Sequence, residues 1–154
     1  MVEILECDFN NTEHRNAIVF LMNHYMEDEM GGVPPLNDTK AEKMVAGLRD
    51  HPSKLVLLVR VNNEFAGLTN CFINFGTFQV KPFINIHDII VLDKYRGKGI
   101  GKKLMEAVIE YARKNDFGKI TLEVRADNIR AQKLYKSCGF GESNPVMHFW
   151  SKYF

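Results

Sequence analysis

The organising segment of this sequence is Asp93-Lys94-Tyr95-Arg96-Gly97-Lys98-Gly99-Ile100-Gly101-Lys102-Lys103. It follows an apolar run, residues 83–92, and leads into a stretch with helical spacing, residues 100–114. Its glycines stand at alternate positions, so backbone N–H groups lie uncovered where a strand passes into a helix, with basic side chains around them. Because N–H groups at a helix N-terminus carry partial positive charge and bind anions, the segment predicts a pyrophosphate site.

The length and composition predict one ordinary globular domain. The chain has 154 residues, 45% of them hydrophobic and 25% charged, which fits a single domain over residues 1–154 with one core. The formal net charge is +1, so no global field favours nucleic acid or an anionic membrane as a partner. The basic residues of the organising segment are therefore a local feature.

The cysteines and the apolar segments favour a reduced, cytoplasmic protein. Cys7, Cys71 and Cys138 are odd in number and form no CxxC or Cys/His cluster, so no metal site is expected. Acidic residues, Glu3 and Glu6 among them, occupy the N-terminus in place of a signal peptide. No run approaches the roughly 20 apolar residues of a membrane span, so we expect no membrane contact.

Apolar periodicity and turn residues divide the rest of the chain into strands and helices. The β-branched run at 54–61 predicts a strand buried on both faces, with Asn62-Asn63 as the hairpin turn to its partner. The predicted strands are residues 2–7, 54–61, 64–75, 83–92, 119–124 and 147–154, and the predicted helices begin near Thr12, near Asp38, at Ile100 and at Asn128. Residues 100, 104, 108 and 112 are apolar at steps of four, which gives the third helix one buried face.

This order of elements predicts an α/β fold, or α+β by a stricter definition. The expected architecture is a mixed central sheet of six to seven strands flanked by four helices. Strand 119–124 should lie parallel to strand 83–92 through a right-handed crossover, because parallel strands joined by a helix connect that way. The three strands before this crossover should form an antiparallel meander.

Two familiar phosphate-binding motifs do not fit the organising segment. A P-loop needs Gly-x4-Gly-Lys-Ser/Thr, whereas Gly101-Lys102 is followed by Lys103 and position 96 is arginine. The dinucleotide fingerprint needs Gly-x-Gly-x-x-Gly at the start of its fold, whereas the glycines here give Gly-x-Gly-x-Gly after antiparallel strands. Another class of phosphate-bearing ligand is therefore favoured.

At this point the sequence resembles the GNAT superfamily of acyl-CoA-dependent N-acyltransferases. The cofactor motif of that family is Arg/Gln-x-x-Gly-x-Gly/Ala between its fourth strand and third helix, and Arg96-Gly97-Lys98-Gly99-Ile100-Gly101 fits every position. A second patch, Asn128-x-x-Ala131-x-x-x-Tyr135-x-x-x-Gly139-Phe140, is similar to the family's second cofactor helix. The patches occur in the family's order and spacing, so the resemblance covers nearly the whole chain.

The resemblance implies that the chain binds acetyl-CoA. Backbone amides from Gly97 to Lys102 would hold the pyrophosphate of coenzyme A. The pantetheine arm would pair with residues 89–91 like an added strand, between central strands that splay apart in this family, and a backbone N–H there would polarise the thioester carbonyl. The implied cofactor-binding residues are Ile89, Ile90, Val91, Arg96, Gly97, Lys98, Gly99, Ile100, Gly101, Lys102, Asn128, Ala131 and Tyr135.

Three residues are candidates for the chemistry. The resemblance places Tyr135 near the sulfur, where a phenol (pKa about 10) can protonate a leaving thiolate; a core tyrosine is the other interpretation. His87 and Asp88 are the candidate bases, because they interrupt an apolar strand, and strand alternation would put them on opposite faces. His87 stands where many family members carry glutamate, and a neutral imidazole accepts a proton near pH 7. Asp88 is open to two further roles, binding a cationic substrate or acting as a structural acid.

The acceptor is expected beside the first two predicted helices and the loop between them. The candidate substrate-binding residues are Tyr25, Glu29, Phe72 and Asn74. The acidic end of the first helix favours an amine, a polyamine or an aminoglycoside, although a solvated helix end gives the same pattern. Trp150 and its aromatic neighbours predict core packing or the interface of a homodimer.

The predicted function is transfer of an acetyl group from acetyl-CoA to a primary amine of a small molecule, by direct attack in a ternary complex. Two alternatives stay open at this point. One is a protein N-terminal or lysine acetyltransferase, which needs an open peptide groove. The other is a non-catalytic acyl-CoA-binding domain that keeps the glycine-rich segment but has no acceptor chemistry.

Overall fold

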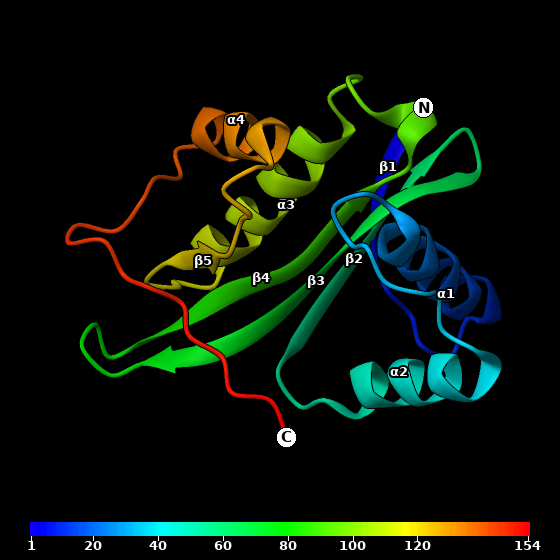
Figure 1. Cartoon of the computed structure of the whole chain (residues 1–154), viewed down its shortest axis with the longest axis horizontal. Coiled ribbons are helices and arrows are strands. Elements are labelled where there is room, and N and C mark those ends of the chain that lie inside the picture. Colours follow the sequence, from blue (N-terminus) through cyan, green and yellow to red (C-terminus); the bar gives the residue numbers. More distant parts are fainter.

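The computed structural model describes residues 1–154 and contains five strands and four α-helices (Figure 1). The strands are β1 (Val2–Glu6), β2 (Lys54–Val61), β3 (Glu64–Gly76), β4 (Lys81–Val91) and β5 (Ile120–Leu122). The helices are α1 (Thr12–Glu27), α2 (Asp38–Asp50), α3 (Ile100–Lys114) and α4 (Ile129–Ser137), with a short 3-10 helix, η1 (Asp93–Tyr95), before α3. None of these helices combines the length and the apolar composition that a membrane span needs.

Local sequence signals set the ends of the helices. The side chains of Asn11 and Asn37 accept backbone N–H hydrogen bonds at the starts of α1 and α2, which stabilises each helix by about 1 kcal/mol. Asn128 caps α4 by accepting the N–H of Ala131 at 3.1 Å, which confirms the predicted N-cap. The chain leaves α4 through Gly139, whose φ of 88° lies in the left-handed region that favours glycine.

The molecule has three layers, with the sheet in the middle. The strand order is β1-β2-β3-β4-β5, antiparallel throughout except for β4 and β5, which are parallel as predicted. Helices α3 and α4 cover one face and α1 and α2 the other (Figure 1). On β2, Leu55, Leu57 and Val59 pack toward α3, whereas Val56 and Leu58 pack toward α1 and α2. Burial of β2 on both faces is therefore confirmed.

Helix α3 carries the buried face that its spacing predicted. Leu104, Met105 and Val108 are fully buried against the sheet, and Ile100 and Ala112 extend the same stripe. Full burial of one such large side chain stabilises the fold by about 1.5–3 kcal/mol. This packing fixes the axis of α3, and with it the position of the glycine-rich turn at its N-terminus.

A β-bulge at His87 changes which side chains of β4 share a face. Asn70 of β3 lies opposite Asp88, and His87 is the extra residue in the pairing with β3. The ring of His87 packs edge-on against Phe72, with the centroids 5.5 Å apart, and Asp88 Oδ2 accepts a hydrogen bond from Asn70 Nδ2 at 2.9 Å. Phe72 and Asn70 both lie on the face toward α1, so His87 and Asp88 share that face. The prediction of opposite faces is wrong, because the extra residue breaks the alternation.

Strands β4 and β5 separate after a short pairing. Residues 84–86 of β4 pair with Ile120–Leu122, while β4 continues to Val91 without a partner on that side. The edge of Ile89–Val91 is therefore open toward α3 and α4. Because β5 is the last strand of the sheet, this gap lies at one side of the sheet and not at its centre.

The strand predicted at residues 147–154 is absent, and the sheet has five strands instead of six to seven. The chain after Ser137 runs as an irregular tail (orange to red in Figure 1) in which Phe149 is 77% and Trp150 is 87% exposed. β5 has only three residues and so offers a short edge for any further strand to pair with. Trp150 therefore lies outside the core of this chain, in contrast to the core packing that was one of its two predicted roles.

Candidate active site

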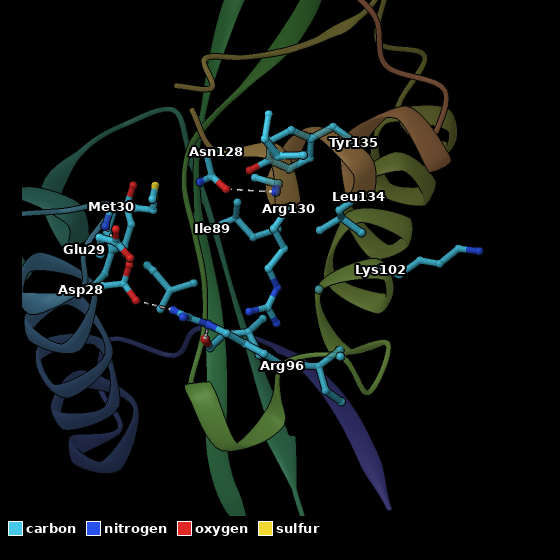
Figure 2. Close-up of a pocket in the computed structure, with 18 of the residues that line it drawn as sticks. Asp28, Glu29, Met30, Ile89, Arg96, Lys102, Asn128, Arg130, Leu134 and Tyr135 are labelled. Atoms are coloured by element: carbon cyan, nitrogen blue, oxygen red, sulfur yellow. Dashed lines mark hydrogen bonds and ion pairs between the residues drawn. The ribbon is translucent and has the colours of Figure 1, made fainter. Parts of the chain in front are cut away.

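A cavity of about 580 Å³ opens where β4 and β5 separate (Figure 2). Its walls are the open edge of β4, the glycine-rich turn and first turn of α3, helix α4, and the end of α1 with the residues after it. Twelve of the thirteen residues implied in cofactor binding line it: Ile89, Ile90, Val91, Arg96, Gly97, Gly99, Ile100, Gly101, Lys102, Asn128, Ala131 and Tyr135. The structure thus brings together two sequence patches that lie about thirty residues apart in the chain.

The glycine-rich turn leaves its backbone bare toward this cavity. Gly97 and Gly99 have φ values of 75° and 78°, and a Cβ atom added to either would have no neighbour within 4 Å. Gly99 is the N-cap residue of α3, so free N–H groups of the first helical turn point past it. At Gly101 an added Cβ would lie 3.1 Å from Leu134 Cδ2, so a glycine here lets α4 approach α3. An open helix N-terminus beside bare backbone fits a bound pyrophosphate.

Two basic residues of this turn have partners within the protein. Arg96 donates from Nε to the carbonyl oxygen of Val91 at 2.9 Å and from Nη2 to Asp28 Oδ2 at 2.8 Å, and it also pairs with Asp93. Lys98 does not line the cavity, and its Nζ lies over the ring of Tyr95 at 5.7 Å. The backbone of the turn, more than these side chains, is therefore what faces a ligand.

Tyr135 of α4 and Tyr25 of α1 both line the cavity. Tyr135 is 8% exposed, and burial, with a smaller effect from Tyr25, raises its pKa to about 12. Burial also raises the pKa of Tyr25, helped by the charges of Asp88 and Asp28. Both phenols stay protonated at neutral pH, so each can donate a hydrogen bond or a proton.

A second cavity of about 440 Å³ adjoins the first and shares six of its residues. The shared residues are Tyr25, Met30, Ile89, Asn128, Ala131 and Tyr135. Tyr135 therefore lies at the junction of the two cavities. His87 and Glu123, which can accept a proton, line the second cavity only.

The other candidate residues differ in whether they line a cavity. Asp88 lines neither cavity, and its carboxylate is held by Asn70, an almost fully buried side chain of β3. Glu29 lines the first cavity, and Phe72 packs against His87 without lining either. Asn74 pairs with Phe83 further along β3 and is not brought to the site.

Several lining residues were not among the candidate site residues predicted from the sequence, although Asp28 belongs to the acidic end of the first helix that was expected on the acceptor side. They are Asp28, Met30, Asp127, Ile129, Arg130 and Leu134 in the first cavity, and Ile86, Leu122, Glu123, Val124, Arg125 and Phe149 in the second. Arg130 extends from the start of α4 toward the glycine-rich turn (Figure 2). Its place in the second motif, two residues after the N-cap Asn128, could have drawn attention to it.

Replacing Arg130 with alanine is expected to weaken coenzyme A binding about three- to tenfold, because one cation facing the phosphate region contributes about 1 kcal/mol. Titration calorimetry with coenzyme A measures the change. The matched control is Lys133→Ala, which removes an exposed cation of the same helix that lines neither cavity. Equal losses in the two variants would mean that Arg130 acts only through the general field of the helix.

Comparison with known proteins shows a family match and several similar sequences. The family model described as "Acetyltransferase (GNAT) family" matches residues 18–140. An uncharacterized N-acetyltransferase of Bacillus subtilis (strain 168), YhfO, is 31% identical over 104 residues, which are 68% of this chain and 69% of that protein. The N-alpha-acetyltransferase RimI of Mycobacterium tuberculosis is 44% identical over 63 residues, 40% of this chain and 38% of that protein.

Solved structures agree on the fold. The crystal structure of a probable acetyltransferase superposes with a TM-score of 0.85, at 20% sequence identity, over 99% of this chain and 98% of that one. At this level of identity the likeness concerns the arrangement of strands and helices. The overall arrangement of strands and helices is therefore one that another protein shares.

Proposed function

The chain belongs to the GNAT acetyltransferase family, and from this premise we propose that it transfers the acetyl group of acetyl-CoA to a primary amine of a small molecule, by direct attack in a ternary complex. The observation that carries the proposal is the pair of adjoining cavities with Tyr135 at their junction. The first, beside the glycine-rich turn, suits coenzyme A. The second, at about 440 Å³, has the size of a small-molecule site.

In this proposal the chain's residues position two substrates and move two protons. Bound acetyl-CoA supplies the thioester. The backbone of the glycine-rich turn holds the pyrophosphate, and the open edge of Ile89–Val91 pairs with the pantetheine arm. An N–H of that edge polarises the thioester carbonyl, which stabilises charge that develops on its oxygen. Because both substrates are held side by side, positioning supplies a large part of the rate.

The proton transfers follow from the groups around the junction. The amine loses a proton to a base, its nitrogen bonds to the carbonyl carbon, the carbon–sulfur bond breaks, and Tyr135 protonates the departing thiolate; the proton taken by the base then returns to the phenolate through solvent. His87 and Glu123 are the two bases that line the second cavity. The carboxylate of Asp88 is occupied by Asn70, so we assign it to fixing the bulge and the electrostatic surroundings of Tyr25.

A peptide N-terminus is the second candidate acceptor, and one observation favours it. Asn85, His87 and Glu123 form a row of polar side chains beside the second cavity: Asn85 Nδ2 donates to Glu123 Oε1 at 3.5 Å, and His87 and Glu123 both line the cavity. An extended acceptor could lie along that row with its amine at the junction. The similarity to a protein named as an N-alpha-acetyltransferase points the same way.

Acetyl-CoA is expected to raise the melting temperature, because a ligand that binds only the folded state adds about 2.7 kcal/mol at one hundred times its Kd. For a chain of 154 residues this corresponds to a shift of roughly 5–10 °C. Differential scanning fluorimetry measures the shift, with ATP at equal concentration as an anion control. No shift with acetyl-CoA, or an equal shift with ATP, would contradict the cofactor assignment.

The acceptor is identified by thiol release from acetyl-CoA with a panel of small amines, polyamines, amino acids, aminoglycosides and N-terminally free peptides. Turnover with a small amine supports the first candidate, and turnover only with peptides supports the second. Binding of acetyl-CoA without turnover on any acceptor would leave a non-catalytic acyl-CoA-binding protein.

A further inference from the structure

One ion pair joins the glycine-rich turn to the end of α1. Arg96 and Asp28 lie 68 residues apart in the chain, and their side chains are 27% and 13% exposed. The contact is direct, with Arg96 Nη2 donating to Asp28 Oδ2 at 2.8 Å (Figure 2). A second donor of the same guanidinium binds the carbonyl oxygen of Val91, at the end of β4. Arg96 is therefore fixed at its own end of the contact and can hold Asp28 in place.

Asp28 in turn organises the segment that follows α1, residues 28–33. Its other carboxylate oxygen accepts the N–H of Met30 at 2.9 Å, and its carbonyl oxygen accepts the N–H groups of Gly31 and Gly32 at 2.9 and 2.8 Å. Although burial favours its neutral form, the hydrogen bonds from Met30 and Arg96 hold the pKa of Asp28 below its usual value. At Gly31 an added Cβ would lie 2.1 Å from the carbonyl oxygen of Tyr25, so the turn is packed closely onto α1.

This segment is a wall of both cavities. Asp28 and Glu29 line the first cavity, and Met30 lines both. On its far side the carbonyl oxygen of Met30 accepts a hydrogen bond from Arg125, in the loop between β5 and α4, at 3.3 Å. Residues 28–33 are thus held by the glycine-rich turn at Asp28 and by the β5–α4 loop at Met30.

We propose that the Asp28–Arg96 ion pair couples the two substrate sites, with Asp28 as a positioning residue that fixes the acceptor-side segment 28–33 when the glycine-rich turn binds its ligand. The inference rests on the proposed function, since it takes the first cavity as the coenzyme A site and the second as the acceptor site. A pyrophosphate bound at the turn stiffens the backbone that carries Arg96. Because Arg96 is bonded to Asp28, the side chain of Asp28 also becomes less mobile. The backbone N–H groups of residues 30–32, which are hydrogen-bonded to Asp28, then become ordered.

Two physical arguments support the coupling. Removing one partner of a mostly buried ion pair leaves the other charge uncompensated, so the pair resists separation more than a surface pair does. Coupling between two sites is reciprocal, so a turn that orders segment 28–33 on binding coenzyme A also binds coenzyme A more tightly when the acceptor holds that segment. Each ligand is therefore expected to raise the affinity of the other by the same factor.

Hydrogen–deuterium exchange on the full chain, with coenzyme A itself as the ligand, tests this coupling without knowledge of the acceptor. In the wild type, coenzyme A should slow amide exchange about five- to tenfold both at Gly97–Lys102 and at Met30–Val33, which corresponds to about 1–1.4 kcal/mol of local stabilisation. In Asp28→Asn the slowing should remain at Gly97–Lys102 and disappear at Met30–Val33. Asp28→Glu keeps the charge and should restore part of it.

The matched control is Asp93→Asn, which removes the exposed carboxylate that pairs with the same guanidinium from the side of η1. It should keep the slowing at both segments. Undiminished slowing at Met30–Val33 in Asp28→Asn would overturn the coupling. Should that variant fail to fold, Arg96→Gln breaks the pair from the other side; because Arg96 also lines the first cavity, exchange at Met30–Val33 is compared at a coenzyme A concentration that restores the slowing at Gly97–Lys102.

Different outcomes of this experiment contradict the cofactor site and the coupling through Asp28. If coenzyme A slows exchange in neither segment of the wild type, the proposed cofactor site itself is wrong. If it slows exchange at Gly97–Lys102 alone, the cofactor site stands and the coupling through Asp28 is wrong.

Discussion

Replacing Gly99 with valine is expected to abolish acetyl-CoA binding, with a rise in Kd of more than about 100-fold. Gly99 has a φ of 78° and caps α3, so its backbone lies in the region where a residue with a Cβ is strained by about 1–2 kcal/mol. An added Cβ would meet no protein atom within 4 Å, and because Gly99 lines the first cavity, a side chain there would occupy space where the pyrophosphate is proposed to lie. Losing two hydrogen bonds to a charged phosphate costs about 3–6 kcal/mol, which sets the expected loss of affinity.

A second substitution separates the effect of backbone strain from the effect of filling the pyrophosphate space. Asparagine tolerates the left-handed region, so Gly99→Asn should keep the fold stable and still lose coenzyme A, because its side chain fills the same space. Calorimetric titration gives the affinity, and thermal melting without ligand gives the stability. Gly47→Ala is the control, since this glycine lies inside α2 and an added Cβ meets nothing within 4 Å. It should bind coenzyme A normally and gain about 0.5–1 kcal/mol of stability. Normal affinity in Gly99→Asn would show that the ligand does not approach the turn closely.

The features predicted correctly from the sequence share a local cause. The N-cap at Asn128 depends on residues within a few positions of it. The buried face of α3 depends on a spacing of four, and the exit from α4 depends on the backbone freedom of Gly139. The motif resemblance then placed the glycine-rich turn and α4 at one site, where the structure brings their residues to a single cavity.

The features that were missed depend on distant parts of the chain. The bulge at His87 is a property of the pairing between β3 and β4, and strict alternation along β4 alone gave the wrong face. The aromatic tail has the composition of a strand, but a strand needs an edge to pair with, and β5 offers only three residues. The contact between Asp28 and Arg96 spans 68 residues and has no signal in either local sequence.

Replacing Tyr135 with phenylalanine is expected to lower kcat about 100-fold while leaving the Kd for acetyl-CoA within about twofold, because a general acid contributes roughly 10²–10⁴-fold and acts only as the thiolate departs. The variant should fold normally, since burial and Tyr25, and no hydrogen bond, account for the raised pKa of this phenol. Thiol-release kinetics with the best acceptor of the panel gives kcat, and calorimetry gives the Kd. Tyr111→Phe is the control, because Tyr111 lies on α3 against Phe117 and lines neither cavity.

The pH dependence gives this substitution a second test. A pKa of about 12 means that Tyr135 keeps its proton throughout the range in which the enzyme is assayed, so its ionisation cannot shape a rate profile below pH 10. The ascending limb of the wild-type profile, along which the amine is activated, should therefore be unchanged in Tyr135→Phe, with the whole profile lowered. A variant that keeps its full turnover would return Tyr135 to a packing role on α4. A variant whose ascending limb moves would show instead that Tyr135 acts through the base, because a donor to the leaving thiolate has no reason to change the pH at which the amine is activated.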